Sequence, residues 1–319
     1  QPFLAIFLVA NALPSVVFAQ TSWPSKSLKI VVPYAAGGPA DVVARELAQK
    51  LSADLKQSVV IENQGGAMGV TALGTVTRAE PDGHTLLMAA FGNIVLQPLL
   101  SKTGGADLLA RLRPISTVST SPHVLVVSAK LPIKTVKELV EYARANPGKV
   151  SFASAGMGGT AHLGMEMFKA LSQTDVLHVP YKGSSGAVND LISGQGSAMF
   201  SSLPSLQGLA DKGLVRVIAA TSSSISPATR NLPLVSTALP GFDYTTWYAM
   251  YAPVGTPNAI IDQANAALRR VLKDAALESR IEPHGIELQS SSPEEVTAWT
   301  KRDTEKWTRV IREAKIAVE

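Results

Sequence analysis

The sequence predicts an α/β protein, and three observations support this fold class. Short β-rich runs, glycine-containing loops and amphipathic helices alternate along the chain, which is typical of α/β architecture. The 319 residues are 46% hydrophobic and 17% charged, which provides enough apolar side chains for a large buried core. At roughly 100 to 200 residues per domain, this length favours two lobes, with a single large α/β domain as the alternative.

The first part of the chain contains three predicted strands, each followed by a loop. Residues 28–32 are a continuous apolar run of strand length, and apolar residues at helical spacing follow over 42–51. The run 59–61 predicts a second strand, and 70–76 carries the next helical face. A Pro-Asp-Gly turn leads into a third strand at 85–89, which we expect to end in a loop.

The middle of the chain repeats this plan, and the last part is mainly helical. Further strands are predicted at 124–127, 150–153, 176–179, 198–200 and 215–220. One helix is predicted at 136–143 and another ends at Gly194. Residues 260–272 keep one apolar stripe, and Ser292 and Glu295 have capping-box spacing before a final helix.

Residues 1–19 predict an export signal peptide. Their apolar stretch is interrupted by Asn11, Pro14 and Ser15, and a membrane-spanning helix needs about 20 mostly apolar residues. Val17-Phe18-Ala19 supplies small or medium residues for a cleavage site before Gln20. We therefore expect a soluble, periplasmic mature protein, with a disordered apolar tail as the alternative interpretation of this segment.

Composition excludes some classes of function. Lys and Arg number 29 against 25 Asp and Glu, and the net charge of +4 is scattered, without runs of like charge. This pattern makes nucleic acid a poor candidate partner. The chain has no cysteine, which excludes thiol catalysis and thiolate zinc sites and is compatible with an oxidising compartment.

Several glycine-rich loops leave the carboxyl end of a predicted strand and lead into a helix. Backbone N–H groups at a helix start lack intrahelical partners and lie at the positive end of the macrodipole, so they bind carboxylate or phosphate without Lys or Arg. Ligand crevices of open α/β sheets lie at this end of the strands. For any single loop, plain connection is the alternative. Asp41 is at least as well placed to close the first helical turn as to contact a ligand.

The sequence carries little sign of catalysis. It has no P-loop, G-x-G-x-x-G, H-E-x-x-H or G-x-S-x-G motif. His162 and Glu166 have the spacing to share a metal, but a cation needs at least one more ligand, which favours a simple polar pair. We expect no catalytic residue, metal or cofactor. A secreted serine-type hydrolase using Ser154 or Ser184 is the alternative, and it requires a base and an orienting acid nearby.

A series of motifs runs through nearly the whole mature chain. The motifs are Trp23-Pro24-Ser25-Lys26, residues 30–41 (IVVPYAAGGPAD), 60–63 (VIEN), 81–87 (PDGHTLL), 154–156 (SAG) with His162-Leu163, 179–183 (VPYKG), Trp247 and 252–257 (APVGTP). In order, spacing and number they resemble the periplasmic solute-binding proteins of tripartite tricarboxylate transporters, the Bug or TctC family.

The resemblance implies a two-lobed, type II periplasmic binding protein fold. Each lobe is a mostly parallel sheet flanked by helices, and crossing strands form the hinge. Lobe 1 is expected to comprise residues 20–120 and 247–319, and lobe 2 residues 121–246. The crossings are expected near residues 117–122 and 244–250.

The resemblance also implies a carrier rather than an enzyme. Such a protein captures a small carboxylate solute between its lobes and delivers it to the membrane permease subunits of a tripartite tricarboxylate transporter. A sensor that docks on a membrane receptor is the alternative with the same fold. A monomer is the default for a freely diffusing carrier.

The family's binding residues can be carried over by position. Family members typically hold a carboxylate in the loop after the first strand through backbone groups and bridging waters. In lobe 1 this corresponds to Tyr34, Ala36, Gly38, Ala40 and Asp41, with Gly92 and Asn93 as further walls. In lobe 2 the corresponding residues are Ser154, Gly156, Thr160, Tyr181 and Ser201.

Three positions depart from the family pattern. Pro39-Ala40 stands where a hydroxyl residue often precedes the aspartate, and Asn63-Gln64 stands where Asn-Arg is usual. Ser201 stands where many members have an Asp that often meets the far end of the solute. Loss of that carboxylate is expected to shift specificity from amino-bearing ligands to mono- or dicarboxylates or aromatic acids.

Overall fold

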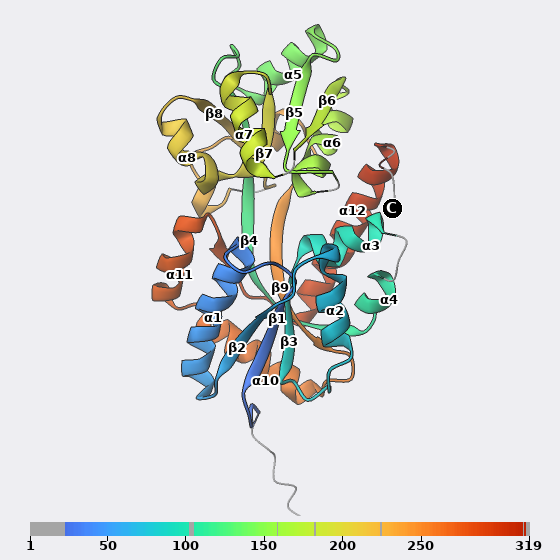
Figure 1. The fold of residues 1–319 in the computed structure, drawn as a ribbon, viewed down its shortest axis with the longest axis vertical. Coiled ribbons are helices and arrows are strands. Elements are labelled where there is room, and N and C mark those ends of the chain that lie inside the picture. Colours follow the sequence, from blue (N-terminus) through green and yellow to red (C-terminus); the bar gives the residue numbers. More distant parts are fainter. Residues whose placement is uncertain are drawn as a thin grey trace, which may run out of the picture.

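The computed structural model describes residues 23–101, 105–157, 159–181, 183–223, 225–314 and 316. The predicted export signal at residues 1–19 lies outside the described residues. The described chain forms two lobes stacked along the long axis of the molecule (Figure 1). Each lobe combines strands and helices, which confirms the predicted α/β class. None of the described helices is long and apolar enough to cross a membrane.

One continuous path of paired strands runs through both lobes, in the order β2-β1-β3-β9-β4-β7-β5-β6, with β8 and β10 also paired to β4. The strands are β1 (Leu28–Val32), β2 (Val59–Asn63), β3 (Thr85–Ala90), β4 (Leu112–Ser128), β5 (Val150–Ser154), β6 (Val176–Pro180), β7 (Ala198–Ser202), β8 (Val215–Ala220), β9 (Thr245–Pro253) and β10 (Glu287–Leu288). In the lower lobe of Figure 1, β1 lies parallel to β2 and β3. In the upper lobe, β5 lies parallel to β6 and β7.

Helices cover the sheets of both lobes. The lower lobe holds α1 (Pro39–Leu55), α2 (Val70–Thr77), α3 (Gln97–Leu100), α4 (Gly105–Leu109), α10 (Asn258–Val271), α11 (Ala275–Ile281) and α12 (Pro293–Glu313). The upper lobe holds α5 (Val136–Ala145), α6 (Thr160–Ser172), α7 (Ser184–Ser193), α8 (Leu203–Asp211) and α9 (Val235–Ala238). Parallel strands need such crossover connections because a hairpin cannot join them. The predicted helix end at Gly194 and the predicted capping box of Ser292 and Glu295 are both confirmed.

Strand β4 passes from one lobe to the other and is much longer than the sequence predicted. Its residues up to Pro122 pair with β9, and its residues from His123 onward pair with β7 and β8. The prediction covered only 124–127 because the first part, LRPISTVSTSPH, is rich in Ser, Thr and Pro and has no continuous apolar run. Pairing with β9 over this whole stretch makes it a strand despite its weak local signal.

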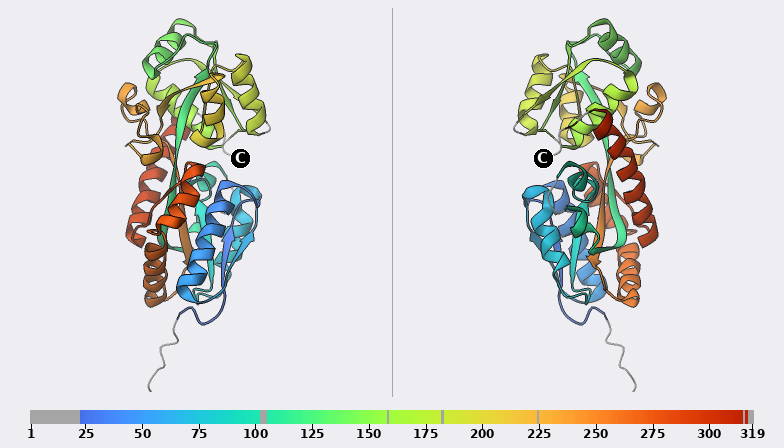
Figure 2. Two further views of the ribbon diagram at one scale, coloured as in Figure 1. Left: turned by 90° about the vertical axis from the view of Figure 1, so that its left-hand side faces the viewer. Right: turned by 90° about the vertical axis from the view of Figure 1, so that its right-hand side faces the viewer.

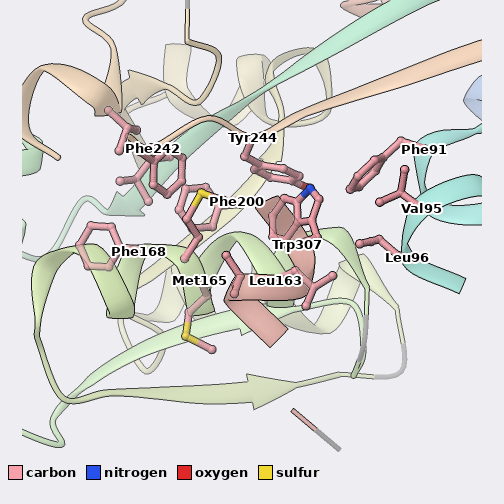
Figure 3. Packing of buried hydrophobic residues seen from close by; sticks show 14 of the residues in the cluster. Phe91, Val95, Leu96, Leu163, Met165, Phe168, Phe200, Phe242, Tyr244 and Trp307 are labelled. Carbon is pink, nitrogen blue, oxygen red and sulfur yellow. The ribbon is translucent and has the colours of Figure 1, made fainter. Parts of the chain in front are cut away.

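A buried aromatic cluster connects the two lobes. Trp307 on α12 packs against Phe91 at 5.7 Å and against Tyr244 at 6.2 Å between ring centroids. Phe200 stacks in turn on Phe242 at 5.6 Å, so the cluster continues into the upper lobe (Figure 3). Figure 2 shows the C-terminal helices α10 and α12 on the side of the molecule opposite the N-terminal strands and helices. The apolar core is therefore continuous across the hinge on this side.

The segment after β3 is helical rather than the expected loop. Gly92–Leu96 forms a π-helical turn that continues into α3. Asn93 holds this turn in place, since its Oδ1 accepts from Ala90 N at 3.1 Å and its Nδ2 donates to Met68 O at 3.0 Å. The neighbouring Gly69 has φ 91°, and a Cβ there would lie 2.6 Å from Asn93 Nδ2, so only glycine fits.

Candidate functional site

A cleft of about 760 Å³ lies between the lobes, where the carboxyl ends of strands from both lobes meet. Four of the predicted site residues line it: Tyr34 and Gly92 from the lower lobe, and Thr160 and Ser201 from the upper lobe. A larger hollow of about 860 Å³ lies between α8 and residues 282–285, but none of the predicted site residues lines it. The cleft is therefore the candidate site.

The cleft lining combines apolar side chains with hydroxyl groups, and it carries no Lys, Arg, Asp or Glu among the described residues. Its side-chain hydroxyls come from Tyr34, Ser121, Thr160, Ser184, Ser185, Ser201, Ser202, Ser205, Thr246 and Tyr248. Burial raises the pKa of the Tyr34 phenol, and it raises the pKa of Tyr248 to about 12. Both phenols therefore stay neutral at ordinary pH and can donate a hydrogen bond.

Four helices begin at the cleft, and none of them has a side-chain cap. The lining includes residues at or near the starts of α1, α6, α7 and α8, namely Pro39, Thr160, Ala161, Ser184, Ser185, Ser202 and Ser205. The N-cap positions of these helices make no side-chain hydrogen bond to the helix. Away from the cleft, α5, α11 and α12 are capped by Thr135, Asp274 and Ser292, whereas α10 begins after Pro257 without a side-chain cap. The helix ends at the cleft thus keep N–H groups for another acceptor.

Asp41 closes the loop before α1 and does not line the cleft. Its Oδ2 accepts from Gly37 N at 2.8 Å and from Arg45 Nε at 2.9 Å. Arg45 also donates to Asn63 Oδ1 at 3.0 Å, which joins the loop after β1 to the end of β2. The Arg45 guanidinium holds the pKa of Asp41 below its usual value. Of the two roles left open by the sequence, this geometry matches closure of the first helical turn.

The other predicted residues are not among those that line the cleft cavity in this structure. Ala36, Gly38 and Ala40 belong to the loop and first turn of α1, next to the lining residue Pro39. Asn93 is 4% exposed and bonds to Ala90 and Met68. Ser154 Oγ donates to Gly156 O at 2.9 Å, which fixes the loop after β5. The Tyr181 hydroxyl bonds to Asp190 on α7. These residues therefore shape the loops around the cleft.

Sequence reasoning missed the residues of the hinge strands. Ser121 and His123 on β4, with Thr246 and Tyr248 on β9, line the base of the cleft. Their positions alternate along each strand, so they lie on the same face of the sheet. Because the first part of β4 was not predicted as a strand, its cleft-facing positions could not be assigned. Residues 119–121 are all polar, so the sequence showed no alternation that could have marked the cleft-facing positions.

Ser154 does not have the environment of an accessible nucleophile. It is 2% exposed, and its Oγ lies 2.6 Å from His178 Nε2. The His178 ring stacks on His162 at 3.9 Å, and His162 Nε2 lies 3.6 Å from Glu166 Oε1. Burial lowers the pKa of His178 to about 4, with His162 as a second cause. Among the described residues, no group of three or more His, Asp or Glu side chains is placed to hold a metal ion.

Comparison with known proteins matches this architecture over most of the chain. Residues 43–316 match the model of the tripartite tricarboxylate transporter family receptor, TctC. BugT from Bordetella pertussis is 30% identical over 312 residues, which cover 97% of this chain and 95% of BugT.

Two solved structures show the same fold in proteins with bound acids. The structure of Rpa4515 from R. palustris with adipate has a TM-score of 0.77 and 30% identity, covering 92% of this chain and 99% of that one. MatC (Rpa3494) from Rhodopseudomonas palustris with bound malate has a TM-score of 0.71 and 27% identity, covering 91% of this chain and 100% of that one. The resemblance and the two-lobed type II fold are thereby confirmed, and the chain belongs to the TctC family of periplasmic solute-binding receptors.

Proposed function

We propose that the protein captures a small carboxylate in the cleft and delivers it to the membrane permease of a tripartite tricarboxylate transporter. The main support is the meeting of four helix starts without side-chain caps in a cleft lined by neutral groups. Such helix ends bind an anion through backbone N–H groups without a formal positive charge. The acids bound by Rpa4515 and MatC support the same ligand class.

The proposed division of labour follows the two lobes. We assign residues 20–120 and 247–319 to lobe 1, and residues 121–246 to lobe 2. In lobe 1, the loop from Tyr34 to Asp41 offers its backbone to one carboxylate. In lobe 2, the starts of α6, α7 and α8 hold the remainder of the solute. Residues 1–19 direct the protein to the periplasm, and the mature protein acts as a carrier without catalysis.

Binding in such a cleft is coupled to closure of the lobes. A solute shifts the open protein toward the closed form only by as much as it binds the closed form more tightly. That difference arises when the solute contacts both lobes. Cleft-lining residues lie on both, with Tyr34 and Gly92 on one lobe and Thr160 and Ser201 on the other. Acids that reach only one lobe are therefore expected to bind weakly.

A thermal-shift screen tests the proposal. The mature protein from Gln20, refolded after denaturation to remove retained solute, is mixed with mono-, di- and tricarboxylates, aromatic acids and amino acids. A solute that binds only the native state raises the melting temperature by mass action. We expect a clear shift with at least one carboxylate class. Absence of a shift across all acids would contradict the proposal.

A matched pair of variants tests whether the cleft is the binding site. Gly92 lies in a helical turn at the cleft, and a Cβ there would meet only the Tyr34 hydroxyl at 4.0 Å. Gly92→Leu should therefore fold and fill the cleft, which removes the thermal shift. Gly208 on α8 has open space around its Cβ position and does not line the cleft. Gly208→Leu should keep the thermal shift, and equal loss in both variants would argue against the cleft.

A further inference from the structure

We infer that His123, on the hinge strand β4, accepts a hydrogen bond from the solute and makes the protein select a hydroxycarboxylate over the same acid without its hydroxyl. This inference rests on the proposed function, since it requires a carboxylate in the cleft. Among the described residues that line the cleft, His123 is the only histidine. It lies at the junction of the two lobes. A solute that bridges the lobes passes this position.

The backbone and ring of His123 are held in a fixed position. His123 N donates to Thr221 Oγ1 at 3.1 Å, and its strand neighbours pair on both sides of β4. Its ring packs on the ring of Tyr244, with centroids 4.6 Å apart and 32° between the planes. Tyr244 is itself buried, and burial raises the pKa of its phenol, so it is neutral. The imidazole therefore presents one defined edge to the cleft.

The hydrogen bond of Nδ1 fixes which nitrogen of His123 carries the proton. Nδ1 lies 3.2 Å from the carbonyl oxygen of Ser121, and a carbonyl oxygen can only accept. Nδ1 therefore donates, which leaves Nε2 of the neutral ring as an acceptor. Burial lowers the pKa of His123 to about 4, partly offset by the Ser121 carbonyl, so the neutral form dominates near neutral pH.

Nε2 of His123 is free to meet a solute. No described residue gives this atom a hydrogen-bond partner, and it is not among the fully buried atoms that lack one. Because the residue lines the cleft, this acceptor opens toward the solute. A hydrogen-bond donor on the solute is needed there, since a carboxylate oxygen would place two lone pairs against each other.

A neutral hydroxyl fits this position better than an ammonium group. The described lining contains no Asp or Glu that could balance a positive charge, and Ser201 stands where many family members carry Asp. Removing an ammonium group from water without a counter-charge is costly. The structure therefore favours acids whose carboxylate binds at the helix starts and whose hydroxyl lies near the hinge.

Matched acids test this selectivity. Dissociation constants are measured by calorimetry for succinate and malate, butyrate and 3-hydroxybutyrate, and adipate and 3-hydroxyadipate. In at least one pair we expect the hydroxy acid to bind about fivefold more tightly, the effect of one neutral hydrogen bond. His123→Phe keeps the ring and removes the acceptor, so the ratio of the two constants should fall to about one. His123→Gln keeps an acceptor and should retain part of the preference.

The outcomes that would overturn this inference differ from those that would overturn the proposed function, and a control variant is available. His284 is exposed outside the cleft, and His284→Phe should leave the preference unchanged. An unchanged preference in His123→Phe, or equal binding within every pair in the wild type, would overturn the inference while leaving carboxylate binding intact. If no acid binds the wild type, the proposed function fails as well.

A spectroscopic measurement tests the chemical basis without any solute. In protein labelled with ¹⁵N-histidine, long-range ¹H–¹⁵N spectra report which ring nitrogen carries the proton. We expect His123 to be protonated at Nδ1 and unprotonated at Nε2 near neutral pH. A proton on Nε2, either alone or in the doubly protonated ring, would overturn the inference because Nε2 would then donate.

Discussion

The two faces of the hinge strands differ in the charge of their surroundings, although the strand residues on both faces are uncharged. The cleft face carries Ser121, His123, Thr246 and Tyr248. The opposite face carries Thr120, Pro122, Thr245 and Trp247, which line a hollow of about 270 Å³ together with Asp243, Glu287, Arg302, Asp303 and Lys306. Strand alternation sends neighbouring residues to opposite faces, and the elements packed on one of these faces supply its charge.

The charged face is a network in which each named group has a partner. Lys306 Nζ lies 3.1 Å from Asp243 Oδ2 and 3.3 Å from Asp303 Oδ1. Asp303 is 2% exposed, and its Oδ2 accepts from Trp247 Nε1 at 2.8 Å. A buried carboxylate is tolerated when it is paired and hydrogen-bonded in this way. The network ties α12 to Trp247 on β9 and to Asp243 in the segment just before β9.

The difference between the faces follows from what each must do. The groups of the charged face pair with one another and need no solute as a partner. The cleft must be stable empty and full, and an unpaired charge in a closing, water-poor cleft is costly. Hydroxyl groups and backbone N–H groups can exchange water for a carboxylate at less cost. The neutral cleft is therefore compatible with reversible binding.

The largest expected effect lies on the charged side of the hinge. Trp307 is 1% exposed and packs against rings from both lobes. Trp307→Ala should lower the free energy of unfolding by about 3 to 5 kcal/mol, because it leaves a large cavity in the shared core. Urea unfolding followed by circular dichroism measures this. Trp299→Ala, at a half-buried position of the same helix, should cost less. Equal losses would contradict the view that the shared core holds the lobes together.

The second-largest effect is expected from a substitution that adds a charge to the cleft face and so makes it resemble the charged face. Ser201→Asp places a carboxylate in the neutral lining, and like charges a few ångströms apart repel by roughly 1 to 4 kcal/mol. Affinity for the best carboxylate of the screen should fall by about tenfold or more, and binding of an amino acid should improve relative to its des-amino analogue. Calorimetry measures both. Ser279→Asp, at an exposed position of α11, is the control. In the wild type, equally tight binding of an amino acid and its des-amino analogue would contradict the role given to Ser201.

Much of the fold was predictable because most strands are short buried runs. β1 and β8 have the predicted bounds, since both are continuous apolar or β-branched stretches between turns. The first part of β4 was missed because pairing with β9, rather than its own composition, makes it a strand. The turn at Gly92 was predicted as a loop, although side-chain bonds of Asn93 make it helical.

The candidate site was predictable where it depends on local sequence. Helix starts after glycine-rich loops can be found from the chain alone, and the structure brings those of α1, α6, α7 and α8 to one cleft. The side-chain directions of Asp41, Tyr181 and Ser154 depend on partners that do not line the cleft: Arg45, Asp190 and His178. The hinge residues Ser121 and His123 depend on a strand pairing that spans the lobes. Tertiary contacts of this kind leave little trace in local composition.

A third and smaller effect concerns a charge turned away from the cleft. Asp41→Asn removes the ion pair with Arg45, and because Arg45 is exposed, the cost near pH 7 should be about 1 to 2 kcal/mol. The folded pKa of Asp41 is below its usual 3.8, so this contribution is present above that pH and is lost as the pH falls through the folded pKa. Urea unfolding near pH 7 and near pH 3 should show the difference shrinking in acid. A constant difference would contradict the ion pair as its cause.

The smallest effect distinguishes a capped helix start from the uncapped ones at the cleft. Thr135 Oγ1 accepts from Glu138 N at 3.1 Å at the start of α5, outside the cleft. Thr135→Ala should therefore lower the free energy of unfolding by about 0.5 to 1 kcal/mol, measured by urea unfolding, and leave solute affinity unchanged. Thr135→Ser keeps the cap and should restore stability. A loss of affinity in Thr135→Ala would show that helix starts away from the cleft also govern binding, and the contrast between capped and uncapped ends would then carry no functional meaning.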